Sequence, residues 1–161
     1  MDQAHLNDYA VGACKPGDLT KRDFATCVTI IKSGGAVDPE AAERELPLVG
    51  AIAIVRRDGQ IVAVGAIKRI RREYAAKIAE KSRKQFPPDT PELGYVAVHP
   101  DHQGHGLSSR IADALLSQHA GPLFATTSSQ RMKSTLGKAG FSQEGQEWEG
   151  GSGRLSLWLK G

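Results

Sequence analysis

The sequence has few cysteines and no long apolar run, and each shortage excludes a class of protein. Cys14 and Cys27 are the only cysteines among 161 residues. Their spacing fits neither a disulfide framework nor a metal-ligand pattern, so we expect two reduced, buried thiols. Residues 1–10 lack the apolar core of a signal peptide, and no later segment approaches the length of a membrane span. These absences predict a cytoplasmic protein with no membrane partner.

Charge of one sign is also scarce, except in one segment. The formal net charge is +3, with 24% charged and 40% hydrophobic residues, which is typical of a soluble globular protein. Residues 68–84 hold eight Lys and Arg against two Glu, a net of +6, which leaves −3 for the rest of the chain. The basic character therefore belongs to one segment, and this argues against general nucleic-acid affinity. The length predicts a single domain over 1–161.

Apolar periodicity and turn residues predict alternating strands and helices. Asp58-Gly59 is the clearest signal, since it predicts a tight hairpin between strands 49–56 and 60–68. Asp18 and Asp38 are each placed to cap a helix. We expect further strands at 9–14, 92–98, 123–127, 141–148 and 154–159, and helices at 19–32, 39–46, 71–86, 108–119 and 130–139.

Residues 94–112 join a strand, a proline turn and an amphipathic helix, with Gly104 and Gly106 at the junction. Unpaired amides at a helix start bind phosphate, and glycines allow the backbone to approach it closely. A dinucleotide-binding loop of the Rossmann type would follow the first strand of a parallel unit, whereas this loop comes late in the chain. The segment therefore predicts a phosphate-binding loop that is not of the Rossmann type.

The loop resembles that of the GNAT family of acetyltransferases, which reads Gln or Arg, two residues, Gly, one residue, then Gly or Ala. Gln103, Gly106 and Ser108 occupy those positions, although Ser108 replaces the usual Gly or Ala and adds a hydroxyl group. Gly140-Phe141 is similar to the family's last helix-to-strand junction. The resemblance implies the GNAT acyl-CoA N-acyltransferase fold, an α/β (α+β) architecture. Its central sheet is mixed and mostly antiparallel, with helices on both faces. It further implies transfer of an acetyl group from acetyl-CoA to a primary amine.

The resemblance also implies roles for individual residues. The Val96 amide would polarise the thioester carbonyl, and Glu92, six residues before Val98, would be the base that deprotonates the amine. The cofactor-binding set would be Val96, Val98, Gln103, Gly104, His105, Gly106, Leu107, Ser108, Ser109 and Ser129.

The sequence departs from the family at two helix positions. Leu136 stands where many members have a tyrosine that protonates the leaving thiolate, and Ser129 replaces an asparagine that contacts pantetheine. No general acid can be assigned. His99, His102 and His105 recur every third residue, but the loop does not place them on one helical face, so we expect no metal site.

Residues 69–91 predict a basic helical insertion between the third and fourth strands. Arg71, Arg72 and Tyr74 are the candidate substrate contacts on it. If they face the acceptor, the cations favour one bearing a carboxylate or a phosphate. Other functions stay open: a coenzyme-A-binding sensor or degenerate enzyme, and an acetyltransferase that acts on protein or nucleic acid through the basic helix. A homodimer is a further possibility.

Overall fold

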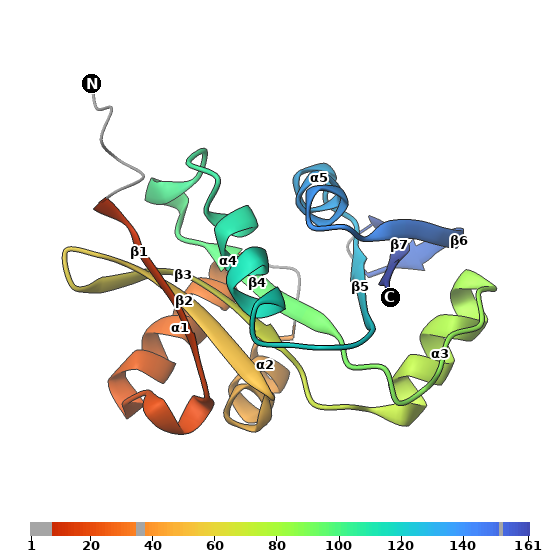
Figure 1. Ribbon diagram of the computed structural model, residues 1–161, viewed down its shortest axis with the longest axis horizontal. Helices are drawn as coiled ribbons and strands as arrows, with labels where there is room; N and C mark the ends of the chain where they lie inside the picture. The colour runs from red at the N-terminus through yellow and green to blue at the C-terminus, as the bar shows by residue number, and fades with distance from the viewer. Residues whose placement is uncertain (1–7, 35–37, 152) are drawn as a thin grey trace.

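Two antiparallel sheets form the framework of the protein in a computed structural model that describes residues 8–34, 38–151 and 153–161 (Figure 1). The first sheet has the strand order β1-β2-β3-β4, and the second has the order β5-β7-β6. The strands are β1 Ala10–Cys14, β2 Ala51–Arg57, β3 Gln60–Ile67, β4 Leu93–Val98, β5 Leu123–Thr127, β6 Ser142–Gly150 and β7 Gly153–Lys160.

Helices cover both faces of the first sheet, because successive residues of each strand point to opposite sides. Ala53 and Val55 pack with helix α4, and Ile52 and Ile54 pack with helices α1 and α2. The helices are α1 Lys21–Ser33, α2 Pro39–Glu45, α3 Arg72–Ser82, α4 Leu107–Leu116 and α5 Gln130–Lys138, with short 3-10 turns at Pro16–Asp18, Leu46–Leu48 and Pro100–His102.

The two sheets meet at one parallel bridge between Glu92 and Phe124. The Phe124 amide donates to the Pro91 carbonyl at 3.1 Å. Beyond this bridge β4 pairs with β3, whereas β5 pairs with β7, so the two strands diverge toward their carboxyl ends (Figure 1). The expected fold class, an α/β fold with mostly antiparallel strands, is confirmed. The strands form two sheets rather than one central sheet.

The basic segment contains helix α3, which covers the second sheet. Its apolar stripe, Ala75 and Ile78, packs with Phe124 and Leu157. The helix ends at Ser82, four residues earlier than predicted, because the next residue takes a left-handed conformation with φ 57°.

Two predicted helix boundaries have different outcomes. Asp38 caps α2 as expected, with its side chain accepting from the Glu40 amide. The prediction that Asp18 caps α1 is wrong: Thr20 is the cap, and Thr20 and Asp23 form a reciprocal capping box. The β2–β3 hairpin turns at Asp58 and Gly59 as predicted, and both residues have positive φ.

Candidate active site

A cleft of about 730 Å³ lies where β4 and β5 separate. Its walls include β4 from Leu93 to Val98 and the end of β5 from Ala125 to Thr127. One end holds Glu92, beside the bridge that joins the sheets, and the other end reaches the loop at Gln103. A ligand in this cleft would lie along the backbone of β4.

A bulge in β4 shapes the middle of the cleft. Val64 pairs with Ala97 and Ala66 pairs with Gly94, so Tyr95 and Val96 together face Gly65. Tyr95 has φ 55°, a left-handed conformation that costs a non-glycine residue about 1–2 kcal/mol. Such strain persists where packing enforces it, and it concentrates at functional sites. The bulge takes Val96, a cleft residue, out of register with β3.

The loop after β4 turns through two left-handed glycines, Gly104 with φ 87° and Gly106 with φ 71°. Nothing lies within 4 Å of where a side chain would begin at either glycine. Gly106 precedes the first residue of α4, and no side chain caps that helix. The first-turn amides therefore lack a side-chain acceptor of their own and suit an anion. Gln103 supports the loop by donating to the Val98 carbonyl at 3.4 Å.

A second helix start faces the same end of the cleft. Ser129 caps α5 by accepting from the Met132 amide at 3.2 Å, and its own amide donates to Thr127 Oγ1 at 3.0 Å. Arg131, in the first turn of α5, donates to Gln103 Oε1 at 3.4 Å and lines the cleft. The sequence prediction missed Arg131. Its position two residues after the cap of a helix expected beside the cofactor was the available signal.

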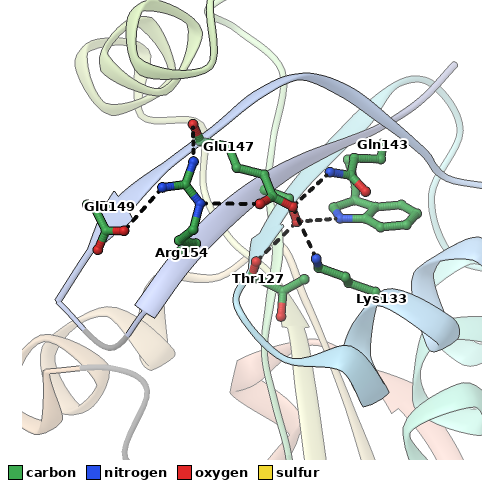
Figure 2. A network of polar contacts seen from close by, with 8 residues as sticks. Thr127, Lys133, Gln143, Glu147, Glu149 and Arg154 are labelled. Atoms are coloured by element: carbon green, nitrogen blue, oxygen red, sulfur yellow. Dashed lines mark hydrogen bonds and ion pairs between the residues drawn. The ribbon is translucent and has the colours of Figure 1, made fainter.

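A polar network holds α5 in place (Figure 2). Strand β6 bulges where it pairs with β7: Glu144 pairs with Leu157, and Trp148 pairs with Leu155. Three β6 residues, 145–147, lie between these two pairs, opposite a single residue of β7. This bulge brings Glu147 to Lys133 of α5 at 3.3 Å and to Arg154 at 3.4 Å. The Lys133 hydrogen bond is the main reason that the pKa of Glu147 is lowered.

A second set of polar contacts, drawn beside the first in Figure 2, holds Thr127, the last residue of β5. Its carbonyl accepts from Ser156 Oγ at 3.2 Å, and that hydroxyl in turn accepts from the Trp158 indole N–H at 2.9 Å. The cleft wall at Thr127 is thus braced by buried side chains of β7.

Glu92 lies at the other end of the cleft and is 5% exposed. Its Oε1 forms ion pairs with Arg71 Nη2 at 2.8 Å and with Lys68 Nζ at 3.3 Å. Lys68 also lies over the Tyr95 ring, 4.2 Å from the centroid, and Arg71 lies over the Tyr74 ring at 4.3 Å. Burial, followed by the charge of Glu92, raises the pKa of Tyr74 to about 12. Glu92 is therefore not a solvent-exposed carboxylate at the start of a strand: it is buried, and two cations compensate its charge.

The predicted substrate contacts differ in position. Tyr74 lines the cleft, Arg71 touches Glu92 from outside the lining, and Arg72 is exposed on the helix surface. Of the predicted cofactor residues, those that line the cleft are Val96, Val98, Gln103, Ser108 and Ser129; Gly104, His105, Gly106, Leu107 and Ser109 lie in the adjoining loop and helix start.

The histidines of the loop contact Tyr9 and one another. His102 Nδ1 is 2.9 Å from the Tyr9 hydroxyl, and the His99 and His102 rings are 5.8 Å apart. Burial, with repulsion from His99 next in weight, lowers the pKa of His102. Within the described ranges no group of three His, Cys, Asp or Glu is arranged to hold a metal ion. No helix in that part of the chain is both long and apolar enough to cross a membrane.

Leu136 is fully buried in the core beside α4 and does not line the cleft. Met132, one turn earlier on α5, faces the cleft instead. A proton donor at position 136 would therefore need a different helix orientation to reach a ligand.

Comparisons with known proteins agree with this geometry. The Pseudomonas aeruginosa acyl-CoA N-acyltransferase is 13% identical, with a TM-score of 0.66 over 95% of this chain and 99% of its own. A GNAT family acetyltransferase from Streptococcus agalactiae is 14% identical, with a TM-score of 0.70 over 93% of this chain and 94% of its own. No curated protein matches. The Acetyltransferase (GNAT) family model matches residues 24–135, so the chain belongs to this family of acyltransferases.

Proposed function

We propose that this protein transfers an acetyl group from acetyl-CoA to a primary amine within the cleft between β4 and β5. The bulge at Tyr95 and Val96 is the observation that carries the proposal, because it interrupts pairing with β3 beside the cleft. Acetyl-CoA supplies a thioester whose carbonyl carbon the amine attacks, so that an amide bond forms, the C–S bond breaks and the thiolate takes up a proton. The proposed role of the Val96 amide is to stabilise the oxygen of that carbonyl.

The loop end of the cleft suits the anionic part of the cofactor. The two helix starts and Arg131 supply hydrogen-bond donors and positive charge, and the bare glycines leave space for close approach. We assign pyrophosphate binding to the backbone of residues 103–109 together with the Arg131 side chain. The pantetheine would then pair with the backbone of Val96 and Val98.

Calorimetric titration with acetyl-CoA tests this assignment. Arg131→Gln is expected to weaken binding by about tenfold, since charge-assisted hydrogen bonds to phosphate are among the strong ones. Lys138→Gln is the matched control, because it removes an exposed cation at the other end of the same helix. Equal affinities of the two variants for acetyl-CoA would refute the Arg131 assignment. If the wild type does not bind acetyl-CoA at all, the proposal that acetyl-CoA is the acyl donor is wrong.

Glu92 is the proposed base, acting on the amine directly or through water. It must be ionised to accept a proton, and its contacts with Lys68 and Arg71 hold it at the cleft wall. Thiol release measured across pH with a panel of amines tests this role. Glu92→Gln should lower kcat/KM at every pH while retaining acetyl-CoA affinity, which also reports that the variant is folded. Wild-type kcat/KM for Glu92→Gln across the pH range would refute the assignment.

A second candidate function is a coenzyme-A-binding sensor or degenerate enzyme, and the buried Leu136 favours it. Acetyl-CoA binding without thiol release from any amine would support this alternative. Action on protein or nucleic acid through α3 is the third, and salt-sensitive RNA or DNA binding would support it.

A further inference from the structure

The charged cluster of Lys68, Arg71 and Glu92, at the Glu92 end of the cleft, has one positive charge in excess. Lys68 and Arg71 both bind Glu92, whereas Arg69 binds Glu45 through two hydrogen bonds of 2.8 and 2.9 Å. The Arg69–Glu45 pair is balanced in itself, whereas Lys68 and Arg71 share the one carboxylate of Glu92, so these three side chains carry one positive charge in excess. Arg44 adds to the positive field here, since its charge acts on Glu45 and Tyr95.

Lys68 is the member of the cluster that brings this excess charge to the cleft. Its side chain is 13% exposed and lines the cleft, and the Tyr95 ring lies below its ammonium group. Arg71 lies outside the lining, and Arg69 is half exposed beside Glu45. A largely desolvated ammonium group that shares its carboxylate with an arginine is left short of negative charge.

We propose that Lys68 and Glu92 together recognise an acceptor that carries a carboxylate close to its amine, as an α-amino acid does. The carboxylate would balance the excess charge at Lys68, and the ammonium group of the acceptor would approach Glu92. The amine would thus arrive beside the proposed base. This assignment rests on the proposed transferase function and names the acceptor class for it.

The cations that reach the cleft at this end favour a carboxylate over a phosphate. Of Arg44, Lys68, Arg69 and Arg71, Lys68 alone lines the cleft, which suits the single charge of a carboxylate better than the charge of about 1.5 to 2 that a phosphomonoester carries at neutral pH. The distance of 3.3 Å between Lys68 Nζ and Glu92 Oε1 also places the two recognising groups side by side. An amine and a carboxylate separated by a single carbon complement such an adjacent pair.

The first test compares L-amino acids with their carboxamides as acceptors for the wild-type protein, using thiol release from acetyl-CoA. The pairs share a side chain and differ in the negative charge. Because the carboxylate also makes the α-amine more basic, kcat/KM is compared per concentration of unprotonated amine. We expect kcat/KM for the amino acid to exceed that for its carboxamide by about tenfold or more, mainly through KM. Equal or better use of the carboxamides would overturn the proposal.

The second test uses Lys68→Met, with Lys77→Met as its control. Lys77 is exposed on α3 and does not line the cleft. Lys68→Met should bring the ratio of kcat/KM for the amino acid to kcat/KM for its carboxamide close to one, and this ratio is unaffected by any loss that the missing Lys68–Glu92 contact imposes on both substrates alike. Lys77→Met should keep the preference. Loss of preference in both variants, or in neither, would contradict the assignment.

Binding measured without turnover separates this proposal from the transferase function. The melting temperature of the wild-type protein saturated with coenzyme A is measured with each amino acid and its carboxamide. A shift with the amino acid alone supports the carboxylate site even if no acetyl group is transferred. If turnover occurs with other amines but no shift appears with any amino acid, the carboxylate proposal fails and the transferase function stands.

Discussion

Gly65 lies under helix α4 and opposite the β4 bulge, and replacing it with alanine should destabilise the protein. A Cβ at this position would collide with Ile111 Cγ2 and lie 3.2 Å from Val96 Cγ2 and 3.4 Å from Leu115 Cδ1. Its backbone φ lies outside the left-handed region, so alanine adds contact without backbone strain. The effect therefore reports how closely α4 approaches β3.

Two opposing contributions set the change in the free energy of unfolding that Gly65→Ala causes. Overpacking of a buried site costs about 1–3 kcal/mol, and the reduced freedom of the unfolded chain returns about 0.4–1 kcal/mol. Because the added Cβ would collide with Ile111 Cγ2, the upper part of the overpacking range, about 2–3 kcal/mol, applies. The net loss is then about 1–2.5 kcal/mol, which corresponds to a fall in Tm of about 2–10 °C for a domain of this size. Urea unfolding and thermal scans measure it. The folded variant should also bind acetyl-CoA more weakly, because the added methyl group presses on Val96.

Gly12→Ala is the matched control, since Gly12 is an exposed glycine of the same sheet with nothing within 4 Å. It should stabilise the protein by about 0.4–1 kcal/mol, because the unfolded chain loses freedom in the same way and no collision offsets the gain. The double variant Gly65→Ala with Ile111→Ala provides a second check, because removing Ile111 Cγ2 makes room for the new methyl group. The free energy of unfolding that the double variant loses should be smaller than the sum of the losses in the two single variants. A Gly65→Ala protein as stable as the Gly12→Ala protein would refute the reasoning.

Four further predictions concern sites outside the Gly65 contact. Gly137→Ala in α5, with nothing near the added Cβ, should stabilise the protein by about 0.5–1 kcal/mol in urea unfolding; a loss would contradict the open environment. Gly145→Ala should cost more than about 1 kcal/mol in the same assay, because φ is 72° and the Cβ would meet the Ser82 carbonyl. Burial raises the pKa of Cys27 to about 12, so its thiol should react with a disulfide reagent at pH 8 only after unfolding. Because burial lowers the pKa of His102, the contribution of neutral His102 to stability is fully present above about pH 6.5 and is lost as the pH falls through its folded-state pKa. His102→Gln should therefore reduce the change in Tm between pH 7 and 5. Equal changes in Tm for the variant and the wild type would count against this prediction.

The sequence predicts elements whose signals are local. The hairpin at Asp58-Gly59, the strand at 123–127 and the cap at Asp38 depend on a few adjacent residues, and all three are confirmed. The predicted helix over 71–86 included Phe86 because this residue continues the apolar stripe. Phe86 does pack on Phe124, with ring centroids 4.9 Å apart, but the chain reaches it after the helix has ended. Periodicity thus predicted the packing correctly and the helix boundary incorrectly.

The cleft could not be predicted in the same way, because it depends on contacts between distant segments. Arg131 meets Gln103 across 28 residues, and Arg71 meets Glu92 across 21. The bulge depends on Tyr95, which takes a conformation that its residue type disfavours because the surrounding packing enforces it. Tertiary context determines all three features, whereas the glycines of the loop act locally and were visible in the sequence.

The basic segment shows why a count of charges is a poor guide to a site. Eight cations within 68–84 suggest a broadly positive surface in sequence, but the structure gives them different environments. Lys68 and Arg71 are bound to Glu92, and other carboxylates hold Arg69 and Lys84. The remaining four are exposed and are absent from the cleft lining: Arg72, Lys77, Lys81 and Arg83. Exposed cations are screened by water and salt, whereas a cation beside a buried carboxylate is screened far less. The proposed selectivity for an acceptor carboxylate therefore rests on Lys68, which lines the cleft, rather than on the net charge of the segment.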